Sequence, residues 1–299
     1  MILSQNTVSF RMTSRFAPSP TGLLHLGHAF SALVAFSRAR ANGGQFLLRV
    51  EDIDAARCRP AFAAAIEEDL AWLGLSWDGP IRVQSRHLAE YGAVLDRLRG
   101  EKLIYPCFCS RAEIAREVAQ SSSAPHEGPD GAPLYPGTCR GMDAGRRAAR
   151  FAEAAPHAWR LDMQAALARL GGSLRFEDAD RPSAERWQAC RPERFGDVVL
   201  ARRDMAASYH LCVTHDDWVQ QVSLVVRGED LRPATDLHRL LQALLGWTAP
   251  AYVHHHLLRD ASGRRLAKRD QASTLRALRE SGATSSQVWA QVRAAAGEC

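Results

Sequence analysis

The sequence lacks a long apolar run and a secretory signal. No stretch of its 299 residues holds about 18 consecutive apolar side chains, so a membrane-spanning helix is excluded. Residues 1–14 lack the basic start, the apolar run and the cleavage site of a secretory signal, and we interpret them as a short leader. These absences favour a protein of the cytoplasm.

An even, regularly spaced set of cysteines is also missing. The chain has seven cysteines, an odd number, and four of them lie far apart in the sequence. Such a set argues against a disulfide framework and favours a reducing compartment. In that setting the remaining, more closely spaced cysteines are better suited to binding a metal ion: Cys107, Cys109 and Cys139.

The composition is not that of a disordered chain. Hydrophobic residues make up 46% of the sequence, which is enough for a sizeable core. The formal net charge of +5 suits an anionic partner such as a nucleic acid or a nucleotide, although many basic proteins bind neither. The length allows one large domain, or one large domain with an insert.

The first hundred residues alternate between strand and helix patterns. Strands are predicted at 15–17 and 45–50, and helices at 23–41 and 61–73, each helix followed by glycine. This order predicts a parallel sheet with crossover helices, which is an α/β fold. Later strand-like runs at 197–201, 209–214 and 223–226 and a helix at 235–245 continue the pattern.

Between these two parts the alternation stops, and residues 121–137, rich in Ser, Pro and Gly, must form a loop. We therefore predict a nucleotide-binding sheet that is split by an insert. The predicted divisions are a leader (1–14), the first half of the catalytic domain (15–100), the insert (101–190), the second half (191–270) and a helical tail (271–299).

The segment Arg15–Gly22 with the following His25-Leu26-Gly27-His28 predicts a strand, a tight loop and two histidines at the start of a helix. Backbone N–H groups at a helix start favour anions, and the small Gly27 lets a ligand approach closely. Two imidazoles there can donate to the phosphates of a nucleotide. The alternative is a pair of ordinary surface histidines.

Two further motifs pair a strand end with charged residues. Carboxylates including Glu51 follow the strand at 45–50, where open α/β sheets bind ligands and where a substrate ammonium group can be paired. Arg227 follows the strand at 223–226 and can offer a bidentate fork to a carboxylate. The alternatives are surface ion pairs at the first site and pairing of Arg227 with Glu229 or Asp230 at the second.

The remaining motifs are a basic loop and a thiol cluster. The run 263–269, which contains Lys268, is by itself only a solvated charge run. The cysteines of the insert can supply three thiolates to Zn²⁺, and the alternative is three buried free thiols. The chemistry leaves the fourth ligand open between His126, the commoner ligand type, and Tyr135, a rare one.

The segment RFAPSPTGLLHLGH resembles the HIGH signature of class I aminoacyl-tRNA synthetases, in the form of the glutamyl and glutaminyl enzymes. LRVEDID resembles their LRxEDTD segment, with Ile53 in place of Thr. GRRLAKR lies where the KMSKS loop belongs and departs from it at Arg265, Ala267 and Arg269, which puts the loop's dynamics in doubt more than its role. The resemblance covers about residues 15–270 and implies the class I Rossmann-like parallel sheet.

The resemblance also implies roles for individual residues. It places Glu51 on the α-amino group of the amino acid and Tyr209 and Arg227 on its side chain, so a guanidinium would select glutamate over neutral glutamine. The implied glutamate-binding residues are Arg15, Phe16, Ala17, Pro18, Ser19, Glu51, Tyr209 and Arg227. The implied ATP-binding residues are His25, Gly27, His28 and Lys268, with Mg²⁺ accompanying the nucleotide.

The order CxC then YxxxC resembles the zinc site of the glutamyl-queuosine tRNA(Asp) synthetases, a family of truncated paralogues of the glutamyl enzymes. That resemblance selects Tyr135 as the fourth ligand of one structural Zn²⁺ beside Cys107, Cys109 and Cys139. Only residues 270–299 follow the KMSKS-like loop, too few for an anticodon-binding domain.

The implied activity is that of an enzyme that forms glutamyl-adenylate from L-glutamate and ATP without tRNA. The glutamate is then transferred to queuosine in the anticodon loop of tRNA(Asp), and we expect the enzyme to be a monomer. The alternatives are a truncated glutamyl-tRNA synthetase that charges a 3′ end and a non-catalytic, synthetase-like RNA-binding module. The survival of His25, His28 and Lys268 argues against the second alternative.

Overall fold

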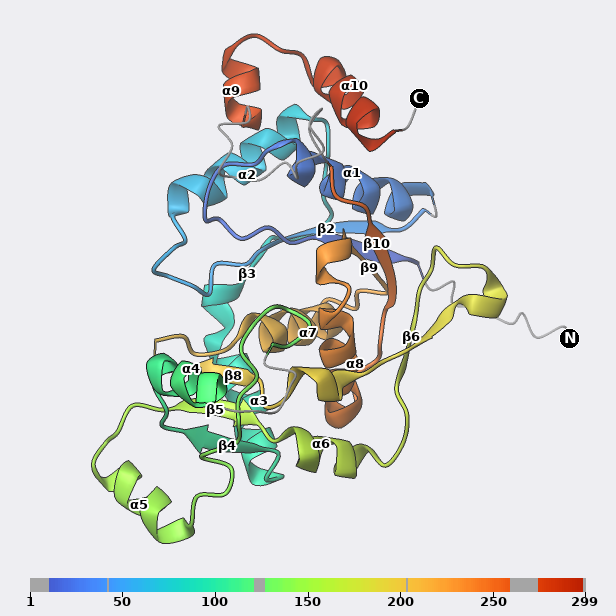
Figure 1. Ribbon diagram of the computed structural model, residues 1–299. Helices are drawn as coiled ribbons and strands as arrows, with labels where there is room; N and C mark the ends of the chain where they lie inside the picture. Colours follow the sequence, from blue (N-terminus) through green and yellow to red (C-terminus); the bar gives the residue numbers. More distant parts are fainter. Residues whose placement is uncertain (1–10, 42, 121–126, 203, 259–273, 298–299) are drawn as a thin grey trace, which may run out of the picture.

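Parallel strands from distant parts of the sequence lie side by side in the computed structural model, which describes residues 11–41, 43–120, 127–202, 204–258 and 274–297 (Figure 1). β1 (Thr13–Phe16) pairs in parallel with β2 (Gln45–Val50), and β2 with β3 (Arg82–Val83). β9 (Leu224–Gly228) pairs in parallel with β10 (Ala251–His255). The parallel arrangement predicted from the order of strands and helices is confirmed.

β1 lies between the other strands of its group, β2 and β3, and the pair β9 and β10. The N–H of Ser223, just before β9, donates to the carbonyl of Thr13 over 3.0 Å. Further along, the Arg15 side chain donates to the carbonyl of Val226 over 3.2 Å, so β1 and β9 run alongside each other in the same direction. The carboxyl ends of β1, β2 and β9 therefore lie at one edge, which is where open α/β sheets bind ligands.

Helices from both ends of the sequence cover this sheet. In Figure 1, α1, α2, α9 and α10 lie together on one side of the strands. One apolar core joins Phe46 and Leu48 of β2 to Phe30 of α1, Leu70 of α2 and Val288 of α10. No helix among the described residues is long and apolar enough to cross a membrane. The bounds are α1 (Leu26–Ala41), α2 (Pro60–Trp72), α9 (Leu275–Glu280) and α10 (Ser285–Ala296).

The insert builds a second, antiparallel sheet with its own core. β4 (Ile104–Cys107) pairs with β5 (Ala158–Leu161), and β5 pairs with β8 (Val199–Arg202), which follows residue 190 in the sequence. β6 (Arg175–Glu177) and β7 (Trp187–Ala189) form a hairpin. The predicted divisions of the chain stay predictions.

The helices around this second sheet are α3 (Leu88–Gly100), α4 (Arg111–Gln120), α5 (Ala144–Ala152) and α6 (Met163–Leu170). The 3₁₀ helices of the described chain are η1 (Gln84–His87), η2 (Ser183–Glu185), η3 (Pro192–Phe195) and η4 (Glu229–Leu231). The core beneath the sheet contains Leu161 of β5, Leu200 of β8 and Leu241 of α8 (Ala234–Leu245). α8 therefore links the insert to the strands that follow it.

One predicted strand is wrong. Residues 209–214 were expected to be extended because Tyr, Val and Thr favour strands. They instead begin α7 (Tyr209–Val219), where the Ser208 side chain caps the helix by accepting from the N–H of Leu211. Residues 211–217 are all buried, so the helix shows no polar face that a sequence pattern could reveal. The other predicted elements are present with bounds that shift by a few residues.

Candidate active site

A cavity of about 690 Å³ opens where β1, β2 and β9 end. The segment after β1, the residue after β2, the first residue of α7 and the end of β9 all contribute to its wall. His28 of α1 lines it as well. The structure thus brings together the whole predicted glutamate-binding set: Arg15, Phe16, Ala17, Pro18, Ser19, Glu51, Tyr209 and Arg227.

Backbone hydrogen bonds hold the loops that form this wall. The N–H of Glu51 donates to the carbonyl of Pro18 over 3.0 Å, which ties the end of β2 to the proline-rich loop after β1. The N–H of Arg59 donates to the carbonyl of Pro20, also over 3.0 Å. Because proline offers a carbonyl but no N–H, these residues suit a loop whose acceptors are used by neighbouring segments.

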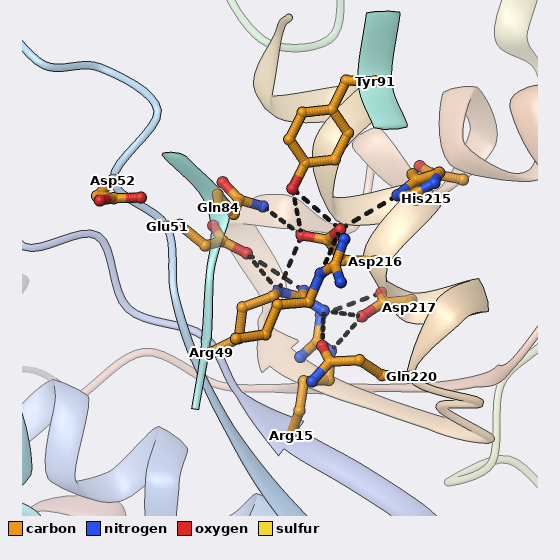
Figure 2. Close-up of polar contacts among 12 residues, drawn as sticks. Arg15, Arg49, Glu51, Asp52, Gln84, Tyr91, His215, Asp216, Asp217 and Gln220 are labelled. Carbon is orange, nitrogen blue, oxygen red and sulfur yellow. Dashed lines mark hydrogen bonds and ion pairs between the residues drawn. The ribbon is translucent and has the colours of Figure 1, made fainter. Parts of the chain in front are cut away.

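A buried charge network lies behind the cavity (Figure 2). Arg49 of β2 is fully buried, and its NH1 lies 2.8 Å from Asp217 Oδ1 while its NH2 lies 3.2 Å from Glu51 Oε1. Arg15 Nε also lies 2.9 Å from Asp217 Oδ1. Although burial by itself would raise it, the two guanidinium groups hold the pKa of Asp217 below its usual range. Arg15 and Arg49 therefore each have a carboxylate partner.

The neighbouring Asp216 of α7 is held from several elements at once. Its carboxylate accepts from Tyr91 Oη of α3, from Gln84 Nε2 at 2.9 Å and from Arg82 Nε at 2.9 Å. Burial opposes ionisation, but the hydrogen bond from His215 and the nearby arginines lower the pKa of Asp216 to about 2. Asp216 thus joins α7 to β3 and α3 as a permanent anion (Figure 2).

Glu51 behaves differently from the two aspartates. Its side chain is 7% exposed, and the residue lines the cavity. Burial raises the pKa of Glu51 to about 7, although Arg49 and Arg15 act against this shift. A cation that enters the cavity would favour ionisation of this carboxyl group, because a cation stabilises the charged form.

Arg227 is buried, but it contacts neutral acceptors. Its Nε lies 3.4 Å from His254 Nε2, its NH1 3.1 Å from His238 Nδ1 and its NH2 2.7 Å from Thr235 Oγ1. Among the described residues no carboxylate lies within ion-pair distance of its guanidinium, so the alternative pairing with Glu229 or Asp230 is absent there. Arg227 therefore lines the cavity with a positive charge that no described carboxylate pairs with.

The two predicted phosphate-binding histidines lie together at the start of α1. Their ring centroids are 3.8 Å apart. Nδ1 of His25 accepts from the N–H of Gly27, and Nδ1 of His28 accepts from the N–H of His25. In each neutral ring the proton must then be on Nε2, which makes that nitrogen a donor. A Cβ at Gly27 would lie 3.0 Å from Cε1 of His25, so this glycine makes room for the ring.

The three cysteines of the insert also come together. Their Sγ atoms all lie within 4.8 Å of one another, and Cys109 Sγ is 3.5 Å from Cys139 Sγ. Tyr135 Oη lies 3.4 Å from Cys109 Sγ and accepts from the N–H of Cys139 over 2.8 Å. Cys107 and Cys139 are almost fully buried. Three convergent thiols can hold a metal ion, and soft sulfur donors in such a cluster suit zinc.

Two predicted residues lie outside the described part of the chain. Lys268 belongs to residues 259–273, and His126 to residues 121–126. The roles of the KMSKS-like loop and of His126 as an alternative fourth ligand therefore stay predictions.

The sequence analysis missed the residues that support the cavity from behind. No role was predicted from the sequence for Asp216, Asp217, Thr235, His238 or His254. One signal was available: Arg49 lies between the apolar residues Leu48 and Val50 of a predicted buried strand, and a buried arginine requires a buried partner. The sequence does not indicate which carboxylate that partner is.

The fold and the cavity define a class of protein, and comparisons with known proteins agree. Residues 11–294 match the family model described as "tRNA synthetases class I (E and Q), catalytic domain". A solved structure of a glutamate tRNA ligase from Elizabethkingia meningosepticum, in complex with its amino acid, superimposes with a TM-score of 0.73 at 28% identity. The match covers 87% of this chain and 52% of that one, so this chain spans about half of that ligase.

Curated relatives of similar length are closer in sequence. A glutamyl-Q tRNA(Asp) synthetase of Rhodobacter capsulatus is 50% identical over 93% of this chain and 98% of its own length. One from Nocardia farcinica is 43% identical over 92% of this chain and 82% of its own. The chain therefore belongs to the glutamyl-Q tRNA(Asp) synthetase family, within the class I synthetases of the glutamyl and glutaminyl type.

Proposed function

We propose that this protein activates L-glutamate with ATP, without requiring tRNA for that step, and transfers the glutamate to queuosine in the anticodon loop of tRNA(Asp). The observation that carries the choice of glutamate is the buried Arg227, which lines the cavity and forms no ion pair with a carboxylate of the described residues. The acceptor follows from family membership, because the relatives bear the name glutamyl-Q tRNA(Asp) synthetase.

In the proposed complex the substrate supplies the charges that the cavity lacks. The side-chain carboxylate of glutamate pairs with Arg227, and its ammonium group pairs with ionised Glu51. The remaining polar contacts come from Arg15, Ser19 and the half-buried Tyr209, which line the same cavity. Neutral glutamine would leave the Arg227 charge uncompensated in a desolvated site, so glutamate is the preferred amino acid.

Activation is a displacement at phosphorus. An oxygen of the substrate α-carboxylate attacks the α-phosphorus of ATP, the bond to the bridging oxygen breaks, and pyrophosphate leaves with its Mg²⁺. The protein positions the reactants and stabilises charge, and no covalent enzyme intermediate is required. The Nε2–H groups of His25 and His28 at the start of α1 are suited to the phosphates. Lys268 is the proposed cation for the leaving pyrophosphate.

Transfer breaks the mixed anhydride. A hydroxyl of queuosine attacks the carbonyl carbon of glutamyl-adenylate, an ester bond forms, AMP leaves and the hydroxyl proton passes to solvent. Basic side chains of the insert and of the 263–269 loop would make salt-sensitive contacts with tRNA phosphates. Activation requires no contact with tRNA, and transfer requires contact with its anticodon end.

The acceptor is tested with an isolated anticodon stem-loop of tRNA(Asp). With queuosine in place, the stem-loop should accept labelled glutamate nearly as well as whole tRNA(Asp). The same stem-loop with guanosine should accept none, because it lacks the hydroxyl. Label found on the 3′ adenosine of whole tRNA and never on the stem-loop would refute the proposal and favour a truncated glutamyl-tRNA synthetase.

We further propose that the insert holds one structural Zn²⁺ through Cys107, Cys109, Cys139 and Tyr135. Bound there, the metal would cross-link the strand end at Cys107 to the loop that carries Tyr135 and Cys139, and so supply rigidity to the insert. Metal analysis of protein purified without chelators should find zinc. Cys109→Ser should lose it and reduce transfer to tRNA more than glutamate-dependent ATP–pyrophosphate exchange.

The fourth ligand is decided by a pair of single variants. Tyr135→Phe removes only the hydroxyl, and His126→Ala removes the competing imidazole. Only the variant that lacks the true ligand should release zinc faster to a chelator. Protein that contains no zinc under non-chelating conditions would refute the assignment.

A further inference from the structure

The contacts of Arg227 determine the protonation states of the histidines around it. A guanidinium group donates hydrogen bonds but cannot accept them, so His238 Nδ1 must accept from Arg227 with its lone pair. The proton of neutral His238 is then on Nε2, which lies 3.1 Å from Nδ1 of His210 and donates to it. His254 likewise presents the lone pair of Nε2 to Arg227 and to the hydroxyl of Thr235.

Burial and positive charge keep these imidazoles neutral. His238 is 3% exposed, and burial together with Arg227 holds the pKa of His238 well below its usual range. Burial and Arg227 also lower the pKa of His254 to about 3. Burial lowers the pKa of His210 to about 4, against the influence of Asp130. Protonation of His238 would also place a second cation 3.1 Å from the guanidinium.

The neutral acceptors use only part of the guanidinium. One N–H each on Nε, NH1 and NH2 is directed to His254, His238 and Thr235. A guanidinium group has five N–H donors, so one remains on each terminal nitrogen. The two terminal nitrogens of a planar guanidinium group can present such a pair of donors to the two oxygens of a carboxylate. The fork is thus oriented by its neighbours and still carries its full charge.

We propose that His238 is a positioning and specificity-determining residue whose neutral imidazole, with His254 and Thr235, orients Arg227 without neutralising it. This inference rests on the proposed use of Arg227 to bind the glutamate side chain. A carboxylate in place of His238 would hold the guanidinium at least as firmly. The introduced carboxylate would also neutralise the charge of Arg227. The side-chain carboxylate of an incoming glutamate would then approach an ion pair without net charge and would lie beside another anion.

Two variants of similar shape separate orientation from charge. In His238→Asn the side-chain oxygen can take the place of Nδ1 and remains neutral, whereas His238→Asp supplies an oxygen with a negative charge. We expect His238→Asn to keep most of the glutamate-dependent exchange, with kcat/KM about threefold lower. We expect His238→Asp to lower kcat/KM for glutamate about 100-fold, mainly through KM, because like charges repel in a desolvated site.

The ratio of glutamate to glutamine activation provides the second measurement. His238→Asp should lower that ratio at least about tenfold, since neutral glutamine does not meet the repulsion. His157→Asp, at a half-buried histidine of the insert, makes the same chemical change away from Arg227 and should leave exchange intact. Thermal unfolding and circular dichroism of each variant verify that the protein is folded.

Each outcome of this experiment decides the inference. Folded His238→Asp with normal KM for glutamate, or folded His238→Asn that is as impaired as His238→Asp, would overturn it while leaving the proposed function in place. Absence of glutamate-dependent exchange in the unchanged protein would instead refute the proposed function itself.

Discussion

The three buried arginines of the described residues have two opposite electrostatic environments, one shared by a first set of two and one of Arg227 alone. Arg15 and Arg49 are paired with Asp217, and Arg49 also contacts Glu51 (Figure 2). Arg227, at the end of a neighbouring strand, contacts two imidazoles and a hydroxyl. The first set joins β1, β2 and α7 and has its charge compensated within the fold. The second leaves its charge for a ligand.

The difference teaches that burial alone does not indicate the role of an arginine. A buried ion pair that loses one partner leaves an uncompensated charge, which costs stability. An arginine that the fold holds with neutral acceptors is already a buried, uncompensated charge in the free protein. An anionic ligand that binds there compensates this charge. Stability should therefore depend mainly on the first set, and substrate choice on the second.

The largest expected effect comes from breaking the compensated set. Asp217→Asn leaves Arg15 and Arg49 buried beside a neutral amide, and we expect the free energy of unfolding to fall by about 3–5 kcal/mol. Urea denaturation measures this loss. The control is Asp180→Asn, which breaks the exposed pair with Arg38 and should cost about 0–1 kcal/mol. Equal effects of the two variants would show that the buried network does not stabilise the fold.

A smaller effect on stability, but a large one on activity, is expected at the uncompensated arginine. Arg227→Gln removes the charge-assisted pair with glutamate and should lower kcat/KM for glutamate-dependent exchange about 100-fold, on the order of 3 kcal/mol. Its free energy of unfolding should change far less than that of Asp217→Asn. Arg227→Lys keeps the charge without the planar fork and should fall between. Normal activation of glutamate by Arg227→Gln would remove Arg227 from its proposed role.

The smallest effect concerns Glu51, the carboxylate that Arg49 and Arg15 influence. Because the pKa of Glu51 is raised to about 7, this group is protonated in the free cavity below that pH and cannot pair with the substrate ammonium. We therefore expect kcat/KM for glutamate to fall as the pH decreases below about 7, by about tenfold per unit once Glu51 is mostly protonated. Glu51→Gln should abolish this acid limb and lower kcat/KM at higher pH. An unchanged acid limb in Glu51→Gln would assign it to another group.

Much of the fold could be predicted from local patterns. The strand at 45–50 appears with the predicted bounds, and the helix at 61–73 appears as α2 with a shift of one residue at each end. The apolar residues of the strand, and the apolar periodicity of the helix with Gly74 after it, were sufficient there. The strand predicted at 209–214 was wrong, because the helix that begins at Tyr209 is buried over most of its length and its polar residues contact other elements instead of water.

The candidate site likewise contains residues that could be selected from the sequence and residues that could not. Residues that follow strand ends, such as Glu51 and Arg227, could be selected from the sequence, because parallel strands bring their carboxyl ends to one edge. The three cysteines could be selected from their spacing. The choice of Tyr135 over His126 rested on the resemblance alone and stays a proposal, because His126 lies outside the described residues.

The sequence by itself determined which residues could meet: motifs at strand ends, histidines at a helix start and a cysteine cluster, all set by local geometry over a few residues. Only the tertiary structure decided how charge is distributed among them. Asp217 compensates Arg15 and Arg49 across some 200 and 170 positions of sequence, whereas His238 approaches Arg227 without compensating it. Electrostatic energy depends on the distance between charges in space and on their burial, and the order of residues in the sequence specifies neither directly.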